Sequence, residues 1–149
     1  MSPARDAKGD GADAPAPPRT GKNRSLRVLL VDDHLLVRCR TRQQLADIPN
    51  VQVVGEATDG FEAVALARTL SPDLVLMDIS MPGLDGLEAT RRITAELPHV
   101  RVIMLSSYAE ESFHKRAIAA GAHGYVVKGE STQSLAAAIQ LVLESPRRG

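Results

Sequence analysis

The residues best suited to chemistry are polar side chains that each follow an apolar run. They are Asp32, Asp33, Asp78, Ser106 and Lys128. Short apolar runs that end at turn signals predict buried strands. In a parallel sheet the strands all point the same way, so their carboxyl ends meet at the edge where ligand crevices form. We therefore expect these side chains to share one crevice.

A phosphoryl-transfer site is the chemistry that this set favours. Carboxylates held close together repel one another unless a cation joins them. Mg²⁺ prefers oxygen ligands and typically binds one or two carboxylates together with phosphate oxygens. Lys128 would add a compact charge for a phosphoryl oxygen, and Ser106 would donate a hydrogen bond to another. Asp78, which is followed closely by a Pro–Gly turn, is our candidate for an acid that accepts a phosphoryl group as a mixed anhydride.

Each candidate also has a simpler interpretation. An Asp after a strand is most often a turn or N-cap residue. Ser106 could equally be a cap, and Lys128 a surface charge. These simpler interpretations would have to hold together at four separate strand ends, so the sequence favours a shared site.

The elements that position these residues alternate along the chain. We expect strands over residues 26–31, 51–57, 74–78, 100–105 and 124–127. We expect helices over residues 34–46, 61–70, 86–97, 110–120 and 131–143. Strands that alternate with helices are typical of an α/β fold, with a parallel sheet covered by helices on both faces.

The first expected helix has an imperfect apolar stripe and a group of basic residues. The stripe consists of Leu36, Val37, Leu45 and Ile48. The basic residues are Arg38, Arg40 and Arg42. We expect these arginines either to form a solvated face or to meet an acidic partner surface. At the other end of the domain, Ser131 is the expected N-cap of the last helix.

Composition is that of an ordinary globular domain. Hydrophobic residues make up 44% of the 149 residues and charged residues 24%, which suggests one domain. The formal net charge is zero, so nothing favours bulk electrostatic binding to nucleic acid or membrane. Cys39 is the only cysteine, which fits a reducing cytoplasm. No apolar run approaches the ~20 residues of a membrane span.

The two ends of the chain differ in composition from its middle. Residues 1–25 are rich in Pro, Ala and Gly and contain no branched aliphatic residue, so we expect a disordered tail. Residues 26–143 carry all the expected strands and helices. Residues 144–149 form a short C-terminal tail.

Four stretches resemble the receiver domain of two-component response regulators. They are residues 30–34 (Leu-Val-Asp-Asp-His), residues 78–86 (Asp-Ile-Ser-Met-Pro-Gly-Leu-Asp-Gly), Ser106, and residues 124–128 (Gly-Tyr-Val-Val-Lys). Residues 53–57 and 121–125 are similar to the branch of that family that is usually fused to a helix-turn-helix output domain. The resemblance covers about residues 26–143. It implies a flavodoxin-like, doubly wound, five-stranded parallel sheet in the order 2-1-3-4-5 with five helices.

The resemblance also assigns roles to the residues of the site. It implies that Asp78 is the phosphoacceptor. It implies a Mg²⁺ site formed by Asp32, Asp33, Asp78 and the backbone carbonyl of Ser80. Lys128 would pair first with the acceptor carboxylate and then with the phosphoryl group.

A switch is the second part of what the resemblance implies. Ser106 would bind the phosphoryl group through its hydroxyl, and Tyr125 would turn in behind it. The phosphoryl donor would be a sensor histidine kinase or a phosphotransfer protein. The switched surface would be the fourth helix, fifth strand and fifth helix, and a homodimer through this face or through the last helix is an expected possibility.

Three other functions are compatible with parts of the pattern. An aspartyl-phosphate hydrolase usually has a second acid two residues after the nucleophile, where this chain has Ser80. A nucleotide-binding domain would have a glycine-rich loop after the first strand, which is missing. A DNA-binding regulator needs an output domain, and residues 144–149 are too few to form one. We therefore expect a self-phosphorylating and autodephosphorylating switch rather than a turnover enzyme, either stand-alone or part of a longer regulator.

Overall fold

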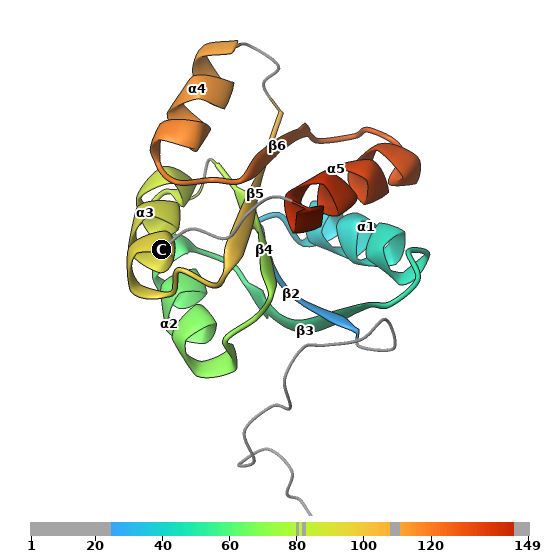
Figure 1. The fold of residues 1–149 in the computed structure, drawn as a ribbon, viewed down its shortest axis with the longest axis horizontal. Coiled ribbons are helices and arrows are strands. Elements are labelled where there is room, and N and C mark those ends of the chain that lie inside the picture. The colour runs from blue at the N-terminus through green and yellow to red at the C-terminus, as the bar shows by residue number, and fades with distance from the viewer. Residues whose placement is uncertain (1–24, 80, 82, 108–110, 145–149) are drawn as a thin grey trace, which may run out of the picture.

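Strands and helices alternate along the part of the chain that the computed structural model describes, residues 25–79, 81, 83–107 and 111–144 (Figure 1). The strands are β2 (Leu26–Val31), β3 (Val51–Ala57), β4 (Leu74–Asp78), β5 (Arg101–Ser106) and β6 (Gly124–Val127). The helices are α1 (Leu35–Ala46), α2 (Gly60–Leu70), α3 (Gly86–Glu96), α4 (Glu111–Ala119) and α5 (Thr132–Glu144). Each expected element is present in these residues, with ends that coincide with the expected ones or differ from them by one residue.

The strands form one sheet in the order β3-β2-β4-β5-β6. All four neighbouring pairs are parallel. Counted along the chain, this is the order 2-1-3-4-5, so the predicted flavodoxin-like topology is confirmed. The chain order reverses direction between β2 and β4, which is the place where doubly wound sheets open a ligand crevice.

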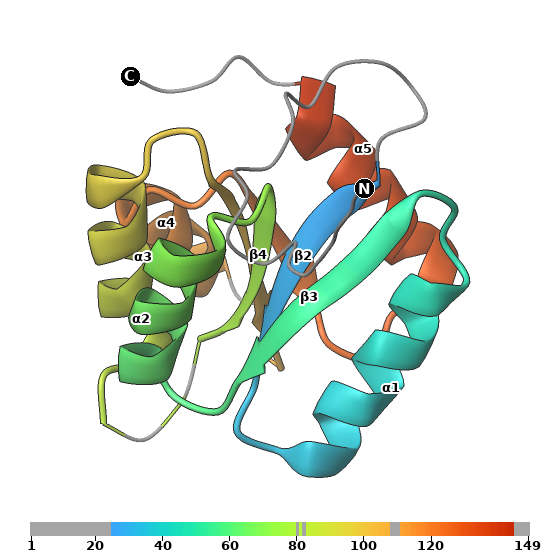
Figure 2. The same ribbon diagram turned by 90° about the horizontal axis from the view of Figure 1, so that it is seen from below.

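Helices cover both faces of the sheet. Figure 2 shows α1 and α5 on one side and α2, α3 and α4 on the other. The central strand β4 is buried along its whole length. Its residues alternate between two apolar clusters: Val75 and Met77 face the α2–α3–α4 side, and Leu74 and Leu76 face the α1–α5 side. Because successive side chains of a strand point to opposite faces of the sheet, β4 contributes residues to both apolar clusters.

Helix α1 packs on the stripe that the sequence suggested, except at Leu36. The expectation that Leu36 belongs to the buried stripe was wrong, because its side chain is 82% exposed. The buried residues are Thr41 and Leu45, and Val37 is half-buried on the same face. Spacings of four place these three residues on one side of a helix, and Leu36 lies about 100° away. Thr41 tolerates burial because its hydroxyl donates to the carbonyl of Val37 at 3.0 Å.

Capping residues fix where the helices begin. The side chain of Asp85, the N-cap of α3, accepts a hydrogen bond from the backbone of Glu88 at 2.9 Å. The Ser131 hydroxyl accepts one from the backbone of Ser134 at 3.1 Å, so Ser131 caps α5 as predicted. The start of α3 is also tied to the end of β4, because the Gly86 amide donates to the Ile79 carbonyl at 3.2 Å.

Candidate functional site

The sheet brings four of the candidate residues to one edge. Asp78 and Ser106 are the last residues of β4 and β5, and Asp32 and Lys128 directly follow β2 and β6. Parallel pairing places Asp78 beside Leu105. The backbone amide of Lys128 donates to the carbonyl of Ser106 at 2.7 Å. The alignment of strand ends that the sequence suggested is therefore present in the structure.

Lys128 bridges two buried acids. Its Nζ lies 3.0 Å from Asp32 Oδ2 and 3.0 Å from Asp78 Oδ1. The carboxylates are 1% and 3% exposed, and the Lys128 side chain is 16% exposed. Burial by itself lowers the pKa of Lys128, but the hydrogen bonds and the negative charges of Asp32 and Asp78 outweigh it, so the pKa is raised. Lys128 is therefore a cation held between the two acids.

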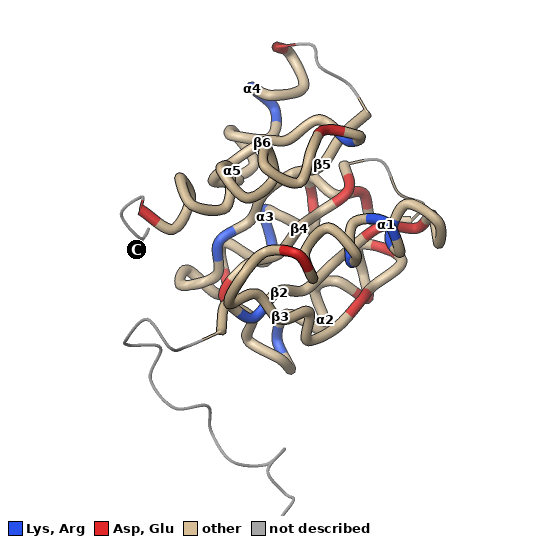
Figure 3. Tube along the Cα trace, turned by 90° about the vertical axis from the view of Figure 1, so that its right-hand side faces the viewer, with Lys and Arg blue, Asp and Glu red and all other residues tan. Residues whose placement is uncertain are grey.

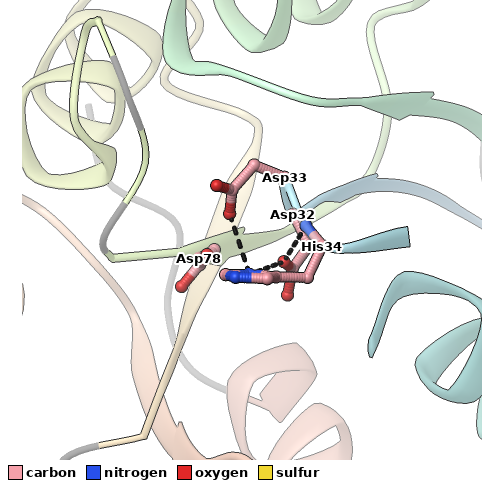
Figure 4. Close-up of side chains that lie close together, drawn as sticks. All are labelled: Asp32, Asp33, His34 and Asp78. Carbon is pink, nitrogen blue, oxygen red and sulfur yellow. Dashed lines mark hydrogen bonds and ion pairs between the residues drawn. The ribbon is translucent and has the colours of Figure 1, made fainter. Parts of the chain in front are cut away.

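Asp33 and His34 complete the acidic end of the crevice (Figure 4). One ligand atom from each of Asp32, Asp33, His34 and Asp78 lies within 4.8 Å of the others. The imidazole Nδ1 of His34 is 3.1 Å from Asp33 Oδ1 and 3.5 Å from Asp32 Oδ1. Three carboxylates offer the oxygen donors that a hard divalent cation such as Mg²⁺ prefers, so the donor set fits that ion. His34 was not among the predicted site residues, although its position directly after Asp33 was a signal.

Asp32 is held from several directions. Its backbone amide donates to the carbonyl of Ala57 at 3.0 Å. Its Oδ1 accepts a hydrogen bond from the backbone amide of His34 at 2.9 Å. Its backbone carbonyl accepts one from Nη1 of Arg38 at 2.8 Å. These contacts leave the acid little freedom to turn out of the crevice.

Two of the three arginines on α1 are paired inside the domain. Arg38 Nε donates to Glu56 Oε1 at 2.8 Å, and Arg42 donates to Glu56 Oε2 at 2.6 Å. The expectation of a solvated or partner-facing arginine group was therefore wrong for Arg38, which is largely buried, whereas Arg40 and Arg42 are exposed as a solvated face would be. Acidic and basic segments lie side by side around the start of α1 in Figure 3. Burial works to raise the pKa of Glu56, but the hydrogen bonds and charges of the two arginines prevail and lower it.

The candidate switch residues lie on the β5–β6 side of the crevice. Ser106 is fully buried at the end of β5 and pairs with Val127. Tyr125 is half-buried on β6, and its ring stacks on that of His114 in α4, with 5.2 Å between centroids and 13° between planes. Tyr125 thus connects the sheet with α4. Ser80, the remaining candidate, lies outside the described residues.

Comparison with known proteins identifies the family of this chain. The sequence matches the response regulator receiver domain family over residues 28–140. The chain belongs to this family. A receiver domain is a module of two-component phosphorelay signalling, so the chain is a signalling switch rather than a turnover enzyme.

Proteins of similar sequence include response regulators that are longer than this chain. It is 46% identical over 122 residues to the response regulator GacA of Pseudomonas viridiflava, an alignment that covers 82% of this chain and 57% of GacA. It is 47% identical to UvrY of Escherichia coli strain K12, with 82% and 56% covered. The chain thus spans little more than half the length of these relatives.

Solved structures of similar proteins share the fold of the receiver domain. A LuxR-family two-component response regulator from Aurantimonas sp. SI85-9A1 superposes with a TM-score of 0.78 at 38% identity, covering 83% of this chain and 88% of that one. The structure of a CheX–CheY–BeF₃–Mg²⁺ complex from Borrelia burgdorferi gives 0.76 at 27% identity, with 80% and 90% covered. Within the described part of the receiver domain, no helix combines the length and the apolar character needed to cross a membrane.

Proposed function

We propose that the receiver domain accepts a phosphoryl group on Asp78 from a phosphohistidine of a sensor histidine kinase or phosphotransfer protein. The observation that carries the proposal is the position of Lys128, whose ammonium lies 3.0 Å from both Asp32 and Asp78 at the carboxyl edge of the sheet. A buried acid with a fixed cation beside it and further acids next to it is arranged to receive a negatively charged group together with a metal ion.

The metal in this proposal is Mg²⁺. Asp32, Asp33 and Asp78 would hold it, with the backbone carbonyl of Ser80 as a further ligand outside the described residues. When bound, Mg²⁺ neutralises the charge of the acids and of the phosphoryl oxygens. The CheY complex of Borrelia burgdorferi, whose structure contains Mg²⁺ and BeF₃, supports this choice by its similarity to the receiver domain.

In the chemical step, the main contribution of the protein is to position the reacting groups. A carboxylate oxygen of Asp78 forms a bond to phosphorus while the phosphorus–nitrogen bond of the donor phosphohistidine breaks. The electron pair of that bond stays on the imidazole nitrogen. No general base is needed, because the attacking group is an ionised carboxylate. Lys128, already paired with Asp78, balances the charge of the phosphoryl group that arrives there.

Ser106 and Tyr125 form the proposed switch. The Ser106 hydroxyl, at the end of the strand next to Asp78, would donate a hydrogen bond to the phosphoryl group. Tyr125 would then leave its stack on His114 and turn in behind Ser106, which alters the face formed by α4, β6 and α5. This is a local charge event that biases an element with two arrangements. The face is the proposed binding surface for downstream partners, including a second copy of the chain.

The organisation of the whole protein is part of the proposal. Residues 26–143 form the receiver domain, and residues 1–25 and 144–149 are tails. The alternative is that this receiver domain is a portion of a DNA-binding transcriptional regulator in the cytoplasm. The length of the GacA and UvrY relatives and the similarity to LuxR-family regulators support that alternative. Nucleic acid is a partner only in that case.

Incubation of the purified protein with a small acyl phosphate and Mg²⁺ tests the proposed function. We expect an acid-stable, base-labile phosphoryl adduct that disappears when the metal is chelated. Asp78→Asn should take up no phosphoryl group. Asp85→Asn is a matched control, because Asn preserves the N-cap of α3 and should leave labelling intact. An adduct that persists in Asp78→Asn would overturn the proposal.

A further inference from the structure

Arg38 joins the acidic loop of the site to the neighbouring strand. Its side chain starts in the first turn of α1 and is only 13% exposed. Nη1 donates to the backbone carbonyl of Asp32 at 2.8 Å, while Nε donates to Glu56 Oε1 at 2.8 Å. One planar guanidinium thus binds the end of β2 and a side chain of β3 at the same time.

The backbone carbonyl that Arg38 binds influences the orientation of two acidic side chains, those of Asp32 and Asp33. The carbonyl of Asp32 belongs to the peptide bond between Asp32 and Asp33, and a peptide unit is planar. Fixing this oxygen therefore fixes the Cα of Asp33 and the direction in which the chain leaves Asp32. Since both carboxylates belong to the proposed metal site, a rotation of this one peptide would move both sets of ligand oxygens.

Glu56 in turn holds Arg38. The carboxylate of Glu56 is 26% exposed and receives Arg38 on one oxygen and Arg42 on the other. Glu56 lies on β3 beside Leu30 of β2, so it is anchored in the sheet itself. Arg42 is 46% exposed, and within the described residues its guanidinium donates to Glu56 Oε2 and to Cys39 Sγ of its own helix.

We propose that Arg38, oriented by Glu56, is a positioning residue that sets the affinity of the acidic site for Mg²⁺ by fixing the peptide between Asp32 and Asp33. The inference rests on the proposed function, because it assumes that these acids hold the metal. Outer hydrogen-bond partners of metal ligands typically alter metal affinity by 10- to 100-fold. Arg38 acts without touching the metal, through the backbone of its ligands.

Calorimetric titration of Mg²⁺ into the unphosphorylated protein tests the inference without any phosphodonor. We expect Arg38→Ala to raise the dissociation constant by about tenfold or more. Arg42→Ala, which removes the other partner of Glu56, should change it by less than about twofold. Arg38→Lys keeps the charge but not the planar fork, so its dissociation constant should lie between those of the wild type and Arg38→Ala.

Thermal unfolding of the same variants separates positioning from folding. If Arg38 were merely structural, the melting temperature would fall while the folded variant still bound Mg²⁺ as the wild type does, and that result would overturn the inference. If Arg38→Ala does not fold, Arg38→Lys is the deciding variant. A Mg²⁺ dissociation constant equal to that of the wild type in Arg38→Lys would overturn the inference. Failure of the wild type to bind Mg²⁺ would instead overturn the proposed function.

Discussion

At the scale of single residues, the site depends on a balance between burial and charge. Asp32 and Asp78 have lost nearly all contact with water, which is costly for carboxylates that have no partner. Lys128 supplies a positive charge 3.0 Å from each of them. The ammonium therefore stabilises the two buried acids, and a metal ion would share that task once bound.

Replacing Lys128 by Gln should destabilise the receiver domain most when no metal is present. Removing one partner of a buried ion pair typically costs about 3 kcal/mol. We expect a loss of that size in the free energy of unfolding without Mg²⁺. The loss should be smaller with saturating Mg²⁺, because the bound metal ion neutralises the charge of the carboxylates in place of Lys128. Urea denaturation measures both values. Lys115→Gln is the control, since Lys115 is 76% exposed. An equal loss with and without Mg²⁺ would contradict this account.

The ion pairs of Glu56 predict how stability depends on pH. The pKa of this carboxyl is lowered in the folded protein, so its contribution is present above the unfolded value of 4.5 and is lost as pH falls through the folded value. Glu56→Gln should therefore cost about 1 kcal/mol near neutral pH. The difference from wild type should shrink between about pH 5 and pH 3. Urea denaturation across that range checks it, and a difference that grows on acidification would refute it.

At the scale of elements, the junction between β4 and α3 sets the position of Asp78, the proposed acceptor. Asp78 ends the strand, and the helix begins at Gly86. A Cβ atom on Gly86 would overlap the backbone carbonyl oxygen of Asp78. The helix therefore approaches the backbone of Asp78 so closely that only glycine fits at position 86.

Gly86→Ala tests this close approach. The added methyl group forces the backbone of α3 away from that of β4, and we expect the free energy of unfolding to fall by about 3 kcal/mol. Gly129→Ala offers a comparison, because Gly129 has a φ of +90° but nothing within 4 Å of an added Cβ. Its cost should be about 1 kcal/mol, from backbone conformation alone. Denaturation of both variants measures the difference, and equal costs would be inconsistent with the overlap.

The sequence predicted the strands better than it predicted the contacts of the helices. Asp32, Asp78 and Lys128 could be placed together because each is the first polar residue after an apolar run, and parallel strands end at one edge. Leu36 was misjudged because an apolar residue one position from the buried stripe resembles a member of it. The pairing of Arg38 with Glu56 was missed because it joins residues 18 positions apart on different elements, and no local pattern indicates such a contact.

At the scale of the whole molecule, one sheet connects the site with both helical layers. Leu76 and Met77 of β4 belong to the two different apolar clusters, and Asp78 directly follows them. The proposed acceptor is thus attached to a strand that is buried along its whole length. The proposed switch pair of Ser106 and Tyr125 lies nearer the edge of the sheet, on β5 and β6. A buried proposed acceptor beside a half-buried Tyr125 that contacts α4 is an arrangement suited to a phosphorylation switch.

The most direct test of the central claim is to map the phosphorylated residue. The protein would be labelled with a small acyl phosphate and Mg²⁺, digested, and its peptides sequenced by tandem mass spectrometry under conditions that preserve acyl phosphates. The account predicts that the phosphoryl group is on Asp78. A phosphoryl group found on Asp32, on Ser106 or on another residue, with Asp78 unmodified, would contradict it.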